Sequence, residues 1–85
     1  MELLFERSAQ TGLRHMPRKQ ALALLERLKR IAADPFGTHP YAKRLVGAQN
    51  AFRVRQGDWR AVHRVDRERN SIHVEQVAHR GEVYR

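Results

Sequence analysis

The spacing of the apolar residues changes near the middle of the chain, and this change most constrains the fold. Between residues 9 and 33 apolar side chains recur at intervals of three and four, which is the period of an amphipathic helix. From residue 51 onward they alternate with polar side chains, which is typical of a strand with one buried face. Two prolines and a glycine between residues 34 and 40 oppose regular structure. The sequence therefore predicts a helical half, a loop and a strand half.

The helical half predicts two helices that form an antiparallel hairpin. The longer one spans residues 17–33, because Pro17 suits a first turn and Asp34 precedes a proline, which disfavours the helical conformation. A shorter helix precedes it, with Ser8 as its N-cap. The apolar stripe of the longer helix consists of Ala21, Leu22, Leu24, Leu25, Leu28, Ile31 and Ala32. Ala9, Leu13 and Met16 face inward from the shorter helix.

The strand half completes an α+β domain. Strands are predicted over residues 2–7, 51–56, 59–66 and 71–78. Gly57 and Asp58 supply a tight turn, and residues 79–85 form a short tail. Helices grouped before a run of strands predict a two-helix hairpin packed on one face of a largely antiparallel four-stranded sheet. With 85 residues, we expect residues 1–85 to form a single domain.

The charge of the chain indicates the class of its partners. Lys and Arg number 17 against nine Asp and Glu, which gives a net charge of +8. Such a balance favours nucleic acid, an acidic protein segment or an anionic membrane. Most of the basic residues are arginine, which suits bidentate phosphate contacts, although a G+C-rich genome would enrich arginine as well. Composition alone does not choose among these partners.

Several classes of protein and site are not supported by the sequence. The absence of cysteine excludes a disulfide scaffold, a zinc knuckle and a thiol nucleophile. The five histidines lack metal-ligand spacing, and the glycines form no phosphate-binding loop, so we expect no metal, nucleotide or other small-molecule cofactor. The longest apolar run, residues 21–25, is too short to cross a membrane, and the N-terminus is too acidic for a signal peptide. We therefore expect a cytoplasmic protein.

Alternation predicts an arginine-rich sheet face. If the apolar residues of the strand at 51–56 point at the helices, Arg53 and Arg55 point away from them, and Arg60 and Arg64 join across the hairpin. Like charges that face one another destabilise a sheet, so an anionic ligand explains such a cluster better than folding does. A solvated basic face without a ligand is the alternative interpretation.

Three motifs follow one another in the second half of the chain. They span residues 42–47, with a Lys-x-Leu-x-Gly spacing, residues 52–63, with Phe-Arg-x-Arg-x-Gly-Asp-Trp-Arg, and residues 78–84, with His-Arg-x-x-Val-Tyr. Together they resemble the basic turn, the arginine-rich hairpin and the C-terminal ending of the RelE/ParE superfamily of bacterial type II toxins. The Leu-rich helix also agrees, so the resemblance covers nearly the whole chain. It implies the small α+β fold of that superfamily.

The RelE branch of this superfamily implies a function and a set of residues. It implies a metal-independent endoribonuclease that cleaves messenger RNA, usually on the ribosome, through attack of the 2'-hydroxyl on the adjacent phosphate. It also implies a cognate antitoxin as partner. The family's active-site positions correspond to Arg53, Arg55, Arg60, Arg80 and Tyr84. Lys43, Arg44 and Arg64 are further candidates for binding RNA.

The proton-transfer group is less well specified by the resemblance. Arg53 stands where the best-known branch has a lysine, and a guanidinium with a pKa above about 12 is a poor base. His79 is the preferred base or acid, because an imidazole titrates near about 6.5. His63 is interpreted as a half-buried structural residue in a position that often holds tyrosine. Tyr84 could stack on a base, donate a proton or pin the tail.

Two other functions stay open. The ParE branch of the superfamily poisons DNA gyrase and lacks the nuclease residue set, whereas this chain fills that set. A non-catalytic module that binds RNA or an acidic antitoxin through the arginine face is the other alternative, because no general base is assured.

Overall fold

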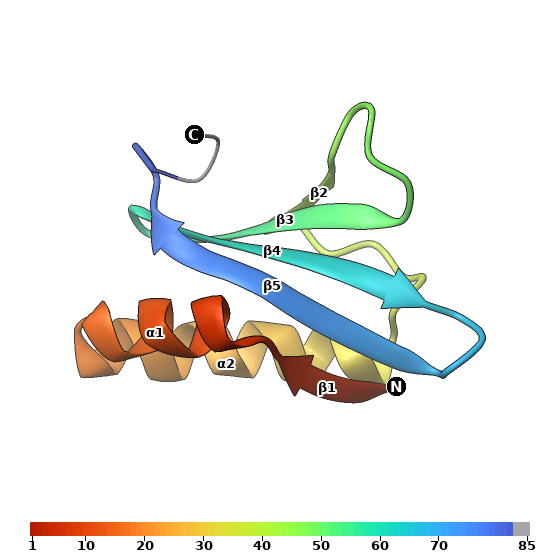
Figure 1. Cartoon of the computed structure of the whole chain (residues 1–85), viewed down its shortest axis with the longest axis horizontal. Coiled ribbons are helices and arrows are strands. Elements are labelled where there is room, and N and C mark those ends of the chain that lie inside the picture. The colour runs from red at the N-terminus through yellow and green to blue at the C-terminus, as the bar shows by residue number, and fades with distance from the viewer. Residues whose placement is uncertain (83–85) are drawn as a thin grey trace.

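Two helices cover one face of a five-stranded sheet in the computed structural model, which describes residues 1–82 (Figure 1). The elements are β1 Glu2–Phe5, α1 Arg7–His15, α2 Arg18–Ala33, β2 Ala42–Arg44, β3 Ala51–Gln56, β4 Trp59–Asp66 and β5 Ser71–His79. The strand order is β1-β5-β4-β3-β2, with β1 parallel to β5 and the other neighbours antiparallel. The predicted α+β class, with a helix pair on one sheet face, is confirmed.

The sheet has one more strand than the sequence predicts. β2 is only three residues long, and it forms because Ala42–Arg44 pairs with β3 at the edge of the sheet. Three residues are too few to show an alternating pattern, so this strand has no signal of its own in the sequence. The number of strands predicted, four, was therefore one too low.

The start of α1 also differs from the prediction. The helix begins at Arg7 with Glu6 in the N-cap position, so Ser8 lies inside the first turn and is not the cap. Glu6 makes no capping hydrogen bond through its side chain. The first strand correspondingly ends at Phe5 instead of residue 7. The backbone of Glu6 is instead fixed against β5, because its N–H donates to the carbonyl oxygen of Val74 at 3.0 Å.

The core lies between the helices and the inner face of the sheet. The buried apolar side chains from the helices and the central strands include Ala9, Leu24, Leu28, Ile31, Val54, Ala61, Ile72, Val74 and Val77. α1 packs so closely on β5 that a Cβ added to Gly12 would lie 1.8 Å from the carbonyl oxygen of Val77. Only glycine fits at this position of α1.

A β-bulge interrupts the pairing of β4 with β5. Val62 pairs with Gln76 and His63 pairs with Val74, so Glu75 has no residue opposite it. A bulge bends its strand and turns the extra side chain to a new direction. Glu75 consequently lies on the outer face of the sheet, which the helices do not cover.

Candidate functional site

Four basic side chains line one small pocket at the end of the outer sheet face formed by β2, β3 and β4. We define the arginine pocket by its lining residues, which are Pro40, Tyr41, Lys43, Arg53, Arg55 and Arg60; its volume is about 80 Å³. The strand register brings these side chains together, because Lys43 lies opposite Arg53 and Arg55 lies opposite Arg60. Residues directly opposite one another project from the same face of a sheet.

The guanidinium of Arg60 is held in place at this pocket. It donates to the carbonyl oxygens of Gly57, at 2.7 Å, and of Trp59, at 2.8 Å. Partial burial lowers the pKa of Arg60, and the charges of Arg53 and Arg55 lower it further. Repulsion of this kind means that the pocket favours an anion that neutralises it.

Arg80 extends the cluster from the end of β5. Its backbone N–H donates to the carbonyl oxygen of Asp58 at 2.7 Å, and its Nε lies 3.8 Å from Oδ1 of the same residue. Both side chains are largely exposed. The charge of Arg80 also lowers the pKa of Arg60, while Asp58 opposes this shift. Arg80 therefore belongs to the electrostatic environment of the arginine pocket.

Arg27 of α2 contacts two residues of the arginine pocket, which the sequence did not indicate. Helical periodicity assigns it to the polar side of the helix, yet its Nη1 donates to the carbonyl oxygen of Arg55. Its guanidinium carbon lies 4.8 Å from the centre of the Tyr41 ring. The N–H of Arg55 in turn donates to the carbonyl oxygen of Tyr41 at 2.8 Å. Arg27 thus helps to position Tyr41 and Arg55, two of the residues that line the arginine pocket.

His79 does not point into the arginine pocket. It lies opposite Trp59, and the two rings meet edge to face with centres 5.7 Å apart. Trp59 packs against the core, on the helix side of the sheet. The next pair, Arg60 and Ala78, projects from the other face. His79 therefore lies on the opposite face of the sheet from the arginine pocket, although it directly precedes Arg80 in the chain.

Two of the RNA-binding candidates also lie away from the arginine pocket. Arg44 is opposite Phe52 and lines small pockets on the helix side of β3. Arg64 is on the outer face, but it pairs with Glu75 at 3.3 Å. Lys43 is the candidate that does join the arginine pocket. Tyr84 lies outside the described residues.

His63 is part of the core and is more deeply buried than predicted. Only 2% of its surface is exposed, and its ring stacks on Phe52 with centres 5.2 Å apart. Within residues 1–82 its buried Nδ1 has no hydrogen-bond partner. Burial, reinforced by the charge of nearby His39, lowers the pKa of His63 to about 4. His63 is therefore a neutral packing residue at neutral pH.

Residues 1–82 lack two further features, a metal-binding cluster and a membrane-spanning helix. Across residues 1–82, no three side chains of His, Cys, Asp or Glu converge in a way that could hold a metal ion. No helix in the same range has the length and apolar character needed to span a bilayer.

Solved structures of other proteins share this fold. The isolated E. coli RelE toxin matches with a TM-score of 0.80 and 23% identity, over 98% of this chain and 89% of that chain. A chain of the RelB–RelE antitoxin–toxin complex from Methanococcus jannaschii matches with a TM-score of 0.78 and 21% identity, over 95% and 94%. A YoeB/ParE toxin from Agrobacterium tumefaciens matches with a TM-score of 0.77 and 17% identity, over 93% and 98%. At these identities the likeness establishes the fold.

The sequence comparison establishes the family. A search among curated proteins gives no match. The model of a family described as "ParE toxin of type II toxin-antitoxin system, parDE" matches residues 3–84, which is nearly the whole chain. The chain therefore belongs to the ParE toxin family of type II toxin–antitoxin systems, within the RelE/ParE superfamily.

Proposed function

We propose that this toxin is a metal-independent endoribonuclease that cleaves messenger RNA on the ribosome, in the cytoplasm. The observation that carries the proposal is the convergence of Lys43, Arg53, Arg55 and Arg60 on one pocket of the outer sheet face. Four cations within one small pocket oppose folding, and a bound phosphate relieves their repulsion. The pocket thus has the chemistry of a phosphodiester site.

The proposed reaction needs only proton transfer and stabilisation of negative charge. The 2'-oxygen of a ribose loses its proton and attacks the adjacent phosphorus, which forms a 2',3'-cyclic phosphate. The bond to the 5'-oxygen breaks, and that oxygen takes up a proton as it leaves. Arg55 and Arg60, which face each other across β3 and β4, are placed to donate to the non-bridging oxygens as their charge grows. Lys43 and Arg53 bind the neighbouring phosphates of the RNA strand.

Proton transfer is assigned to groups within the arginine pocket. Lys43 and Tyr41 are its lining side chains that can exchange a proton. His79, on the other face of the sheet beside Trp59, is expected to contribute little to the chemical step. Tyr84 keeps the role implied by the family resemblance, as a stacking residue or proton donor. His79→Ala and Tyr41→Phe separate these assignments, because only the second should slow cleavage.

A cognate antitoxin is the proposed protein partner. The related chain from Methanococcus jannaschii was solved as a RelB–RelE antitoxin–toxin complex. With a net charge of +8, this chain would bind an acidic, partly disordered segment that covers the arginine pocket. Binding to the folded state alone would raise the melting temperature of the toxin. The same segment would exclude RNA and silence the toxin.

Single-turnover cleavage of ribosome-bound message tests the proposed function. Removing one transition-state donor typically lowers a rate by about a hundredfold to a thousandfold. Arg55→Ala and Arg60→Ala should show losses of about tenfold or more, with a much smaller loss of RNA affinity. Arg18→Ala, at the exposed start of α2, is the matched control and should cleave normally. Equal, small effects of all three changes would contradict an active site here.

Poisoning of DNA gyrase is the second candidate function, and membership in the ParE family favours it. Induction of the toxin distinguishes the two. Messenger-RNA cleavage arrests protein synthesis first, whereas gyrase poisoning produces DNA breaks while messages stay intact. Purified toxin that inhibits gyrase supercoiling and leaves ribosome-bound message uncut would replace the nuclease proposal.

A further inference from the structure

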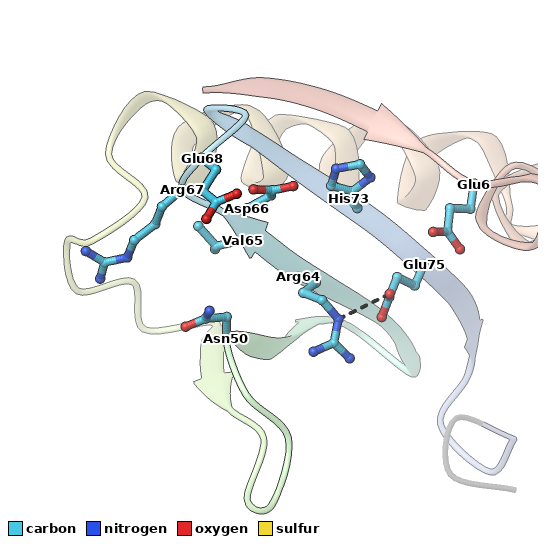
Figure 2. Close-up of a pocket in the computed structure, with 9 residues that line it drawn as sticks. All are labelled: Glu6, Asn50, Arg64, Val65, Asp66, Arg67, Glu68, His73 and Glu75. Carbon is cyan, nitrogen blue, oxygen red and sulfur yellow. Dashed lines mark hydrogen bonds and ion pairs between the residues drawn. The ribbon is translucent and has the colours of Figure 1, made fainter.

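A second pocket, with a volume of about 660 Å³, lies further along the outer face of the sheet (Figure 2). We name it the Arg64 pocket; its lining residues include Glu6, Asn50, Arg64, His73 and Glu75. Figure 2 shows Arg64 and Glu75 joined at its centre, with His73 and Glu6 on one side and Asn50 on the other. Its volume lies in the range of about 300 to 1,000 Å³ found for small-molecule sites.

Arg64 is fixed at the centre of this pocket. Its Nε lies 3.3 Å from Oε2 of Glu75, and its Nη1 donates to the carbonyl oxygen of Gln49 at 2.6 Å. The β-bulge supplies the first of these partners, because it leaves Glu75 unpaired on β5 and turned toward Arg64. Bulges are frequent beside functional sites, where they redirect a side chain. A planar guanidinium held on two sides is a platform on which an aromatic ring can stack.

The charges of the Arg64 pocket differ from those of the arginine pocket. Glu6, Asp66, Glu68 and Glu75 all line it, in a protein that is strongly basic overall. Within residues 1–82, Glu6 and Glu68 have no ion pair. Carboxylates repel phosphate but accept hydrogen bonds from amino groups. Carboxylates beside the donors of Arg64 and Asn50 match the edge of a nucleobase better than they match a phosphate.

The two pockets lie on one face and along one strand. Arg60 and Arg64 are four residues apart on β4, so their side chains project from the same face. Four residues of strand span about 13 Å. Single-stranded RNA with a stacked rise of about 3.4 Å per nucleotide covers this span with about four nucleotides, and with fewer where it is extended. A strand held by its phosphates in the arginine pocket therefore reaches the Arg64 pocket.

We propose that the Arg64 pocket binds a nucleobase of the RNA strand whose phosphate occupies the arginine pocket. The base stacks on the guanidinium of Arg64, and its exocyclic amino group donates to the carboxylate of Glu75 or Glu6. Cytosine, adenine and guanine carry such an amino group and uracil does not, so the pocket selects amino-bearing bases over uracil. This inference rests on the proposed nuclease function, and it assigns sequence preference to a place distinct from the cleavage chemistry.

Nucleosides test the pocket without phosphate and without catalysis. In amide-resolved NMR titrations of the full chain, cytidine should shift the amide signals of Asn50, Arg64, His73 and Glu75, and uridine should shift them far less. Good base contacts are worth about 1–3 kcal/mol, so Glu75→Gln and Arg64→Ala should each weaken cytidine binding by about fivefold to a hundredfold. Arg64→Lys keeps the charge but removes the planar platform, and it should weaken binding as well.

Arg69→Ala is the matched control, because Arg69 lies on the exposed turn after β4 outside the Arg64 pocket. Its cytidine affinity should equal that of the wild type. Equal shifts with cytidine and uridine, or cytidine binding that survives Arg64→Ala and Glu75→Gln, would overturn the inference. So would the absence of shifts together with loss of antitoxin binding in the two variants, which would make the pocket a protein interface.

The outcome for cleavage is separate from the outcome for the pocket. If the toxin cuts message but binds neither nucleoside, the proposed nuclease function is supported and this inference is overturned. A toxin that binds cytidine in the Arg64 pocket but cuts no message loses the nuclease function, and the pocket then stands as an RNA-binding subsite only. For an active toxin, Glu75→Gln should in addition redistribute the cleavage positions along the message.

Discussion

Mild acid is expected to destabilise the toxin through His63. This side chain is 2% exposed in the middle of β4, and its ring stacks on Phe52. Burial, with a smaller contribution from His39, lowers the pKa of His63 from 6.5 to about 4. A proton added to the folded protein would therefore place a charge on a buried ring whose Nδ1 has no hydrogen-bond partner within residues 1–82.

The magnitude follows from the difference between the two pKa values. Above pH of about 6.5 the ring is neutral in both the folded and the unfolded chain, and the full stability is present. As the pH falls from about 6.5 to about 4, the unfolded chain binds a proton that the folded chain does not. The free energy of unfolding then decreases by up to about 1.4 kcal/mol per pH unit, and by about 3 kcal/mol in total. A domain of 85 residues typically has a free energy of unfolding of roughly 4–13 kcal/mol, so this decrease is a large part of the total.

Urea unfolding followed by the fluorescence of Trp59, the one tryptophan in the chain, measures this effect between about pH 7 and about pH 4.5. His63→Phe keeps a ring against Phe52 but cannot be protonated, so its stability should depend less steeply on pH than that of the wild type. His15→Gln, at the exposed end of α1, should retain the wild-type slope. If the free energy of unfolding depended on pH equally steeply in the wild type and in His63→Phe, the reasoning would be refuted.

Two further changes test the packing of α1 and the support of the arginine pocket. Gly12→Ala should destabilise the fold by about 1–3 kcal/mol or more, because its Cβ would meet the backbone of β5, whereas Gly81→Ala has open space around it and should be neutral in urea unfolding. Arg27→Ala should slow single-turnover cleavage by about tenfold or more through misplacement of Tyr41 and Arg55, with RNA affinity nearly unchanged. Arg30→Ala, on the exposed side of the same helix, should leave cleavage and affinity at wild-type values, and equal losses in the two variants would contradict a positioning role.

Much of the fold could be predicted because its signals are local. Within the predicted helical stripe, Leu24, Leu28 and Ile31 are buried as the periodicity requires, whereas Leu22 is exposed. The alternation along β3 and β4 likewise brings Arg53, Arg55 and Arg60 to one face, since a hairpin register follows from a short turn. Both patterns are complete within a single element or a pair of adjacent elements.

The remaining features depend on contacts between distant segments. β2 exists only as a partner of β3, and the bulge that exposes Glu75 appears only where β4 meets β5. Alternation assigns Arg64 to the correct face, but it does not reveal that Glu75 neutralises it. The position of His79 beside Arg80 in sequence likewise does not reveal its contact with Trp59. Sequence proximity was a poor guide to which groups share a site.

The electrostatics of the arginine pocket bear on both of the ligands proposed for it, RNA and an acidic antitoxin segment. Burial and the neighbouring guanidinium groups lower the pKa of Arg60, so its charge is least favourable when the pocket is empty. Any polyanion relieves this repulsion, whether it is an RNA backbone or an acidic protein segment. Charge alone therefore makes RNA and antitoxin competitors and does not distinguish between them. Selection must come from features that a phosphate does not require, namely the ring of Tyr41 and the mixed donors and acceptors around Arg64. Substitutions at these residues should therefore change the ratio of the affinities for RNA and antitoxin more than they change the overall affinity for anions.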